Sequence, residues 1–277
     1  MKIIPATKEQ VAPGFHIRRA LPLYYYHSIG PFLLLDQMGP RTLAPGEGQG
    51  IPPHPHRGFE TITYMIEGKV EHHDSLGNKG VVGPGEVQWM TAASGIIHAE
   101  YIAPDFKEKG GKLHGFQIWV NLPAKDKMIR PSYQQFGKEE FPAVHRNDAE
   151  IRVIAGTYEN ITGPVKTRTP LSVYHVFLKA GGMVDLSFQE SFETGIYIAD
   201  GSVNIENNTH QNGMMVFMEK DKKVLIQATE DAHLLVLSGE PIREPVATFG
   251  PFVMNTQDEI REAILDYQSG KFGVLEG

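Results

Sequence analysis

The sequence contains no cysteine among its 277 residues. Disulfides, thiolate metal sites and cysteine nucleophiles are therefore excluded together. Any metal ion that the protein binds must be held by histidine and carboxylate side chains.

Long apolar runs and an excess of positive charge are also missing. Runs such as Phe32 to Leu35 are far shorter than the roughly 18 residues that cross a bilayer. The segment from Met1 to Gly14 lacks the apolar stretch of a secretory signal peptide. Lysine and arginine number 26 against 33 aspartate and glutamate residues, for a net charge of -7, which argues against a nucleic-acid-binding surface. We therefore expect a soluble, cytoplasmic, monomeric protein that binds neither nucleic acid nor membranes directly.

Turn-forming residues divide the whole chain into short pieces, with 29 glycines and 19 prolines. Between them lie segments rich in Val, Ile, Phe, Tyr and Trp, for example 60–68, 86–91, 116–122, 173–178, 213–218, 223–228 and 233–239. Many short strands with close turns predict an all-β sandwich or barrel. Helices of the length that a parallel sheet requires are not evident in the pattern.

One helix is predicted near the C-terminus. Thr256 and Glu259 form a capping-box pattern, which is typical of a helix start. Three apolar residues then recur at helical spacing, Ile260, Ile264 and Tyr267, and Gly270 is a natural stop. We expect this helix to close the outside of a sheet.

An internal repeat indicates two similar β-domains. The triplet Phe59-Glu60-Thr61 is echoed by Phe192-Glu193-Thr194. At the same offset, Gly68 falls on Gly201, within the similar segments 67–70 and 200–203. The break between the domains is predicted to lie between residues 123 and 148, a stretch with several prolines and many charges.

The only strong chemical signal is a group of histidines in the first half. His54 and His56 are two residues apart, so in a strand both imidazoles point to one face. His98 and Glu100 have the same spacing. Two such pairs on neighbouring strands would bring three histidines and one carboxylate together, a set that suits Fe, Ni, Cu, Mn or Zn and leaves coordination positions open. The tandem His72 and His73 point to opposite faces and are expected to be solvent-exposed.

These motifs resemble those of the cupin superfamily. Gly48, the H-x-H pair, Glu60 and Gly68 resemble its first motif, and residues 95–98 resemble its second. More narrowly, the chain is similar to the pirin family along its length, at segments 29–36, 54–61, 90–100, 114–123, 152–156 and 250–256. The resemblance implies a bicupin, with two jelly-roll β-barrels and a C-terminal helix. We place an N-terminal cupin domain with the metal site at residues 1–135 and a C-terminal cupin domain without metal at 136–277.

The resemblance also implies the ligands. His54, His56 and His98 would bind one divalent ion, with Fe(II) expected and Ni, Cu, Mn, Co or Zn as alternatives. The general cupin pattern makes Glu60 the carboxylate ligand, whereas the pirin pattern makes it Glu100. We favour Glu100 and expect Glu60 to support the site or the packing, because Arg57 and Gly58 can bend the strand between the histidines and Glu60. The role of His114 stays open between the cavity and the core.

The second domain is expected to have lost its site. At the repeat offset, His54 and His56 correspond to Ser187 and Gln189, which are too weak as ligands for a transition metal. His233 would fall near the third ligand position, but Leu235 follows where an acid is needed.

Two functions follow from the resemblance. The first is a metal-dependent dioxygenase similar to quercetin 2,3-dioxygenase, which opens a flavonol ring with O2 and releases carbon monoxide. Glu100 would then be the catalytic base for the flavonol hydroxyl. The alternative is a non-enzymatic, iron-binding, redox-sensing regulator that acts through protein partners.

Overall fold

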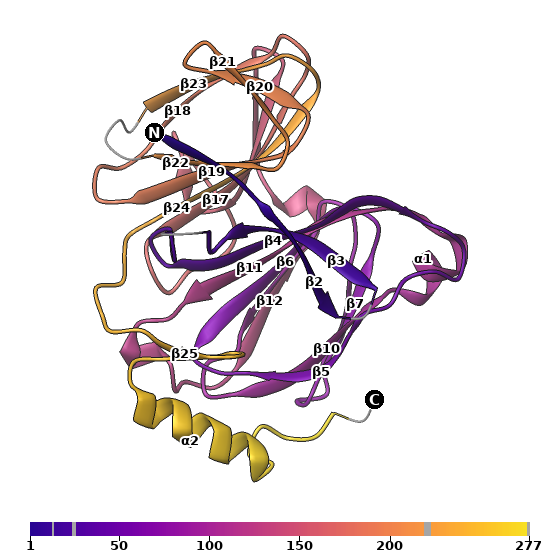
Figure 1. Cartoon of the computed structure of the whole chain (residues 1–277), viewed down its shortest axis with the longest axis vertical. Helices are drawn as coiled ribbons and strands as arrows, with labels where there is room; N and C mark the ends of the chain where they lie inside the picture. The colour runs from indigo at the N-terminus through magenta and orange to yellow at the C-terminus, as the bar shows by residue number, and fades with distance from the viewer. Residues whose placement is uncertain (13, 24–25, 219–222, 276–277) are drawn as a thin grey trace. The chain divides into compact units, whose positions relative to one another are not determined.

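The structure is a computed structural model that describes residues 1–12, 14–23, 26–218 and 223–275. Antiparallel strands account for most of it (Figure 1). The chain divides into two compact units. We call residues 8–17, 35–138 and 242–277 the histidine unit, and residues 1–7, 18–34 and 139–241 the aliphatic unit.

The histidine unit contains most of the residues of two sheets. A seven-stranded sheet has the order β12 (Ser132–Phe136), β9 (Val87–Thr91), β6 (Phe59–Glu67), β11 (Gly111–Asn121), β4 (Phe32–Leu43), β3 (Phe15–Leu21) and β2 (Thr7–Ala12). A four-stranded sheet has the order β5 (Ile51–His56), β10 (Ile96–Ile102), β7 (Val70–Asp74) and β8 (Lys79–Val82). Apolar residues of this unit, including Met65, Val82 and Leu113, form a buried cluster.

The aliphatic unit repeats this plan. Its seven-stranded sheet has the order β1 (Lys2–Pro5), β22 (Met214–Met218), β19 (Glu193–Asp200), β24 (Ala232–Gly239), β17 (Leu171–Leu178), β14 (Ala149–Ala155) and β13 (Ala143–Arg146). The four-stranded sheet has the order β18 (Met183–Ser187), β23 (Lys223–Ala228), β20 (Ser202–Ile205) and β21 (Asn208–Gln211). Burial alternates strictly along β18, where Val184 and Leu186 enter the core cluster and their neighbours are exposed.

The prediction of an all-β chain with two barrel-like domains and a C-terminal helix is confirmed. The strand order β9-β6-β11-β4 of one unit matches β22-β19-β24-β17 of the other, and β5-β10-β7-β8 matches β18-β23-β20-β21. The echoed triplets lie at the starts of the matching strands β6 and β19. Gly68 and Gly201 occupy the turns that follow, with φ of +83° and +77°, a conformation that favours glycine.

The C-terminal helix α2 (Gln257–Gln268) begins with the predicted capping box between Thr256 and Glu259. Its buried face differs from the predicted stripe, because it comprises Ile260, Ala263 and Asp266 while Tyr267 is exposed. The helix follows a small hairpin of β25 (Ala247–Phe249) and β26 (Phe252–Met254). Residues 242–277 cluster with the histidine unit, whereas the sequence boundaries assigned the helix to residues 136–277. The reason is that this C-terminal segment contacts β5, β10 and the turn after β5, as described below. Such contacts between distant residues are not evident from the order of segments along the sequence.

Short elements complete the described chain. The six-residue helix α1 (Pro104–Lys109) was not predicted, since fewer than two turns carry little periodicity. Two 3-10 turns, η1 (Ala124–Asp126) and η2 (Lys138–Glu140), and a small pair of strands, β15 (Thr157–Tyr158) and β16 (Ile161–Thr162), form the remaining connections. None of the helices in the described ranges has both the length and the apolar composition needed to span a bilayer.

Candidate metal centre

Three histidines from two neighbouring strands converge in the histidine unit. β5 carries His54 and His56 on one face, and β10 pairs with it so that His98 lies opposite His54. One nitrogen of each imidazole lies within 4.8 Å of one nitrogen of the other two. The convergence that the H-x-H spacing predicts is therefore present in the structure.

The hydrogen bonds and the burial of these ring nitrogens suit a bound cation. His54 donates Nδ1–H to the carbonyl of Pro52 at 2.8 Å, so its Nε2 keeps the lone pair. His56 Nδ1 and His98 Nε2 are buried and have no hydrogen-bond partner in the described part of the chain. Burial is the main cause that lowers the pKa of His56 and of His98 well below the ordinary value, and the neighbouring imidazoles lower it further. Neutral imidazoles with free lone pairs fit a divalent transition metal.

Glu100 lies two residues beyond His98 but is not part of this group of three. The register shift beside these residues lies on β5, where Ile51 and His54 pair with Glu100 and His98, whereas β10 pairs with β7 without interruption, so Glu100 stays on the same face of β10 as His98. Thr63 on β6 donates its hydroxyl to Glu100 Oε1 at 2.9 Å and lies 3.3 Å from Gln117 Oε1. Glu100 therefore has one oxygen held by Thr63, and its role as the fourth ligand stays a prediction.

Glu60 belongs to a different sheet from the histidines. β5 ends at His56 and β6 starts at Phe59, and the chain turns between them at Arg57 and Gly58, where Gly58 has a φ of +89°. Glu60 is buried and accepts a hydrogen bond of 2.6 Å from Thr91. The parity that relates Glu60 to His54 and His56 is thus interrupted at the corner, as the sequence suggested.

The expectation of solvent exposure is wrong for His72. This residue is 2% exposed, and its Nδ1 lies 3.3 Å from Nδ1 of His98. His73 points to the other face, where its ring contacts Tyr101. The usable signal was the spacing of His72 and Asp74, which places both on the same face of β7.

His114 lies in the core and not beside the three histidines. It is 1% exposed, and its Nε2 is 2.8 Å from Nε2 of Gln37. Gln117, on the other face of β11, is the residue that contacts Thr63 near Glu100. Of the two roles that the sequence left open for His114, the structure shows the core position.

Two buried cationic side chains, Arg57 and Lys127, stabilise the turn that follows His56. Arg57 is 3% exposed and donates to Asp266 of α2 at 2.8 Å. It also donates to the carbonyl of Ser94 and lies over the ring of Phe272. Lys127 donates to the carbonyls of Gly58 and Val253 and to Asn121 Oδ1. The C-terminal segment is therefore bound to the end of the histidine-bearing strand.

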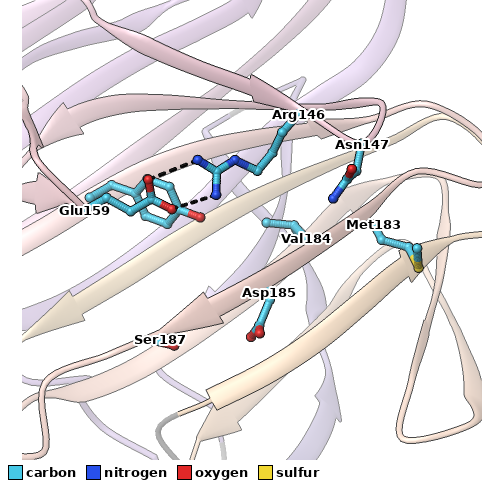
Figure 2. A pocket seen from close by; sticks show the side chains of 8 residues that line it. Arg146, Asn147, Glu159, Met183, Val184, Asp185 and Ser187 are labelled. Atoms are coloured by element: carbon cyan, nitrogen blue, oxygen red, sulfur yellow. Dashed lines mark hydrogen bonds and ion pairs between the residues drawn. The ribbon is translucent and has the colours of Figure 1, made fainter.

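In the aliphatic unit, Ser187 and His233 do not take positions that match those of the three histidines. Ser187 lies on the exposed face of β18 and lines a pocket of about 300 Å³, together with Asp185 and an ion pair of Arg146 with Glu159 (Figure 2). This pocket contains no histidine. His233 lies on β24 and contacts His175 at 2.9 Å, whereas the strand that corresponds to β10 is β23. The repeat offset therefore misplaces the third position.

Comparisons with known proteins agree with the fold. The chain matches the Pirin family profile over residues 14–120 and the Pirin C-terminal cupin domain over residues 173–273. It is 42% identical over 275 residues, covering 96% of this chain and 95% of the relative, to a protein of Pseudomonas aeruginosa provisionally named quercetin 2,3-dioxygenase. It is 37% identical to pirin of Homo sapiens, covering 94% of this chain and 89% of that protein. The solved structure of quercetin 2,3-dioxygenase from Acinetobacter baumannii is 36% identical, has a TM-score of 0.94 and matches 100% of this chain and 98% of its own. With two cupin domains, a converged histidine triad and relatives aligned along nearly its whole length, the chain belongs to the pirin family.

Proposed function

We propose that this protein is a metal-dependent dioxygenase that opens the ring of a flavonol with O2 and releases carbon monoxide. The single observation that carries the proposal is the group formed by His54, His56 and His98, in which His56 Nδ1 and His98 Nε2 are buried and lack partners among the described residues. Relatives named as quercetin 2,3-dioxygenases support the choice of substrate class.

The histidines and Glu100 would hold one divalent ion, with Fe(II) as the proposed ion. When bound, such an ion acts as a Lewis acid that acidifies a hydroxyl group coordinated to it. Glu100 would accept the proton of the flavonol 3-hydroxyl. The hydrogen bond from Thr63 fixes one carboxylate oxygen, which leaves the other oxygen available for this transfer.

Aromatic residues next to the histidines supply an apolar wall. The rings of Phe59 and Trp119 lie 5.0 and 5.4 Å from the ring of His56. Trp119 is partly exposed, on the same face of β11 as Gln117. A flat aromatic substrate would pack against Trp119, which the buried ring of Phe59 supports from behind at 4.4 Å, and would exclude water from the reacting carbons.

The test is aerobic turnover of quercetin by protein loaded in turn with Fe(II), Ni(II), Mn(II), Co(II), Cu(II) or Zn(II). We expect loss of the flavonol, uptake of one O2 and release of one carbon monoxide for each substrate molecule, with at least one of these metals. His56→Ala should lose most of the bound metal and the turnover. His145→Ala changes an exposed histidine on β13 and should retain both.

A metal-loaded protein that consumes no O2 with any flavonol would contradict the proposal. Tight metal binding without turnover would then favour the alternative, a redox-sensing regulator that acts through protein partners.

A further inference from the structure

His98 is the one member of the histidine group whose second nitrogen meets another side chain. His72 on β7 is the diagonal cross-strand neighbour of His98, since His98 pairs with Asp74 and His72 pairs with Glu100. The two Nδ1 atoms are 3.3 Å apart, and the residues are 1% and 2% exposed. One of the two nitrogens must carry the hydrogen, because two lone pairs at this distance would repel each other.

The direction of this hydrogen bond decides whether His98 can bind a metal. If His98 donates Nδ1–H, its Nε2 keeps a lone pair toward the other two histidines. If His72 donates instead, His98 holds its hydrogen on Nε2 and cannot act as a ligand there. The same question does not arise for His54, because the carbonyl of Pro52 can only accept.

The surroundings of the other nitrogen of His72 settle the direction. His72 Nε2 lies 2.9 Å from the hydroxyl of Tyr133 and 3.6 Å from Asp74 Oδ2. The Tyr133 hydroxyl has two acceptors for its own hydrogen, Met90 Sδ at 2.9 Å and the Asp74 carboxylate, so it accepts from His72. The Asp74 carboxylate is an acceptor anchored by the backbone of Leu76 and by the backbone and side chain of Asn78. With acceptors on this side, His72 carries its hydrogen on Nε2 and presents a lone pair at Nδ1.

We propose that His72 is a positioning residue that fixes the tautomer and ring orientation of His98 for metal binding. Asp74 and Tyr133 in turn orient His72. This inference rests on the proposed metal site, but it concerns residues on β7 and β12, two strands that carry none of the proposed ligands. A hydrogen bond to the second nitrogen of a metal-bound imidazole typically changes metal affinity by about 10–100-fold.

The test uses variants that separate the two nitrogens of His72. The amide of asparagine places an oxygen near the position of Nδ1, whereas the amide of glutamine reaches toward Nε2. We expect His72→Phe and His72→Gln to weaken Ni(II) binding by about 10–100-fold, measured against a competing chelator. His72→Asn should retain most of the affinity. His73→Asn makes the same change one residue on, on the opposite face, and should bind as the native protein does.

The tautomer itself is read from ring 15N chemical shifts of the native metal-free and Zn(II)-loaded protein. We expect a protonated Nδ1 on His98 and a protonated Nε2 on His72. Equal Ni(II) affinity in His72→Phe and native protein, or a hydrogen on Nε2 of metal-free His98, would overturn the proposal. Neither measurement uses a flavonol, so a protein that binds metal without turnover would disprove the dioxygenase function and leave this inference standing. The native spectrum remains decisive if a variant does not fold.

Discussion

The two glutamates near the histidine motifs differ in what they contact. Glu100 is half-buried, and Thr63 holds one of its oxygens. Glu60 is 1% exposed and is bonded to Thr91 within the seven-stranded sheet. The proposed proton transfer therefore belongs to the half-buried Glu100, whereas Glu60 packs within the sheet.

Replacing each glutamate by glutamine separates these roles. Glu100→Gln should retain part of the metal, because three imidazoles remain, and should lower flavonol oxidation by about 10²–10⁴-fold, because an amide accepts no proton at this position. Glu60→Gln should retain both metal and turnover and lower thermal stability. Metal content and O2 uptake of the two variants, measured in parallel, check this. The reverse pattern would make Glu60 the carboxylate ligand, as in the general cupin pattern.

At the level of elements, the corner between β5 and β6 is where α2 and the hairpin of β25 and β26 attach. Val253 donates its backbone N–H to the carbonyl of Arg57 at 3.0 Å. A Cβ on Gly58 would lie 1.9 Å from the carbonyl oxygen of Val253, so only glycine allows this approach. Ile97, which precedes His98, packs against the apolar cluster of α2 and the C-terminal segment. The helix therefore restrains both histidine-bearing strands from outside.

Asp266→Asn tests this attachment. The change leaves the Arg57 guanidinium, with a side chain only 4% exposed, without its carboxylate partner. Loss of one partner of a buried ion pair costs about 3–5 kcal/mol, which we expect as the decrease in free energy of unfolding. Asp258→Asn, in the exposed first turn of the same helix, should change it by less than about 0.5 kcal/mol. Denaturant unfolding of both variants gives the comparison, and equal stabilities would show that the attachment contributes little.

Through Lys127, the stability of the folded protein depends on pH. Burial is the main cause that lowers the pKa of Lys127 to about 8, although Glu244 and Glu259 act to raise it. The unfolded chain releases this proton only near 10.5, so between these pH values the unfolded state binds more protons and stability rises with pH.

A comparison of native protein with Lys127→Met isolates this effect from other titrating groups. The variant is expected to be less stable at pH 7, because the carbonyls of Gly58 and Val253 and the amide oxygen of Asn121 lose their donor. The stability advantage of the native protein should then grow by up to about 3 kcal/mol from pH 7 to 10.5, since each unit of pKa difference corresponds to about 1.4 kcal/mol. Thermal unfolding across this range measures it. A constant difference would mean that the Lys127 pKa is the same in the folded and unfolded chains.

For the whole molecule, local patterns in the sequence predicted most of the fold. Period-two alternation, turn glycines, the capping box at Thr256 and the H-x-H pair each depend on a few adjacent residues. What they could not predict depends on strand register and distant contacts. The contact of His72 with His98 follows from how β7 pairs with β10. The partner of Arg57 lies 209 residues away along the chain. The repeat offset failed at His233 because the connecting segments of the two units differ in length.

The interiors of the two units differ where their strands correspond. β18 and β23 pair Leu186 with Val224 and Val184 with Ile226, and all four side chains enter one apolar core. The corresponding strands β5 and β10 pair His54 with His98. We therefore expect about one tightly bound Ni(II) or Zn(II) per chain by elemental analysis after dialysis. Two per chain, with one lost on changing Ser187 or Gln189, would contradict this.

The turn glycines Gly68 and Gly201 have a consequence for recognising distant copies of this barrel. Each occupies a backbone conformation that other residues adopt only with strain. The two turns are equivalent, although the side chains at the corresponding interior positions of the two units are histidines in one and aliphatic in the other. A barrel can therefore exchange its histidines for aliphatic side chains and still need the glycine at its bend. A sequence search that gives the turn glycines more weight than the metal ligands should find barrels that have lost their metal site. A search that requires the histidines will miss them.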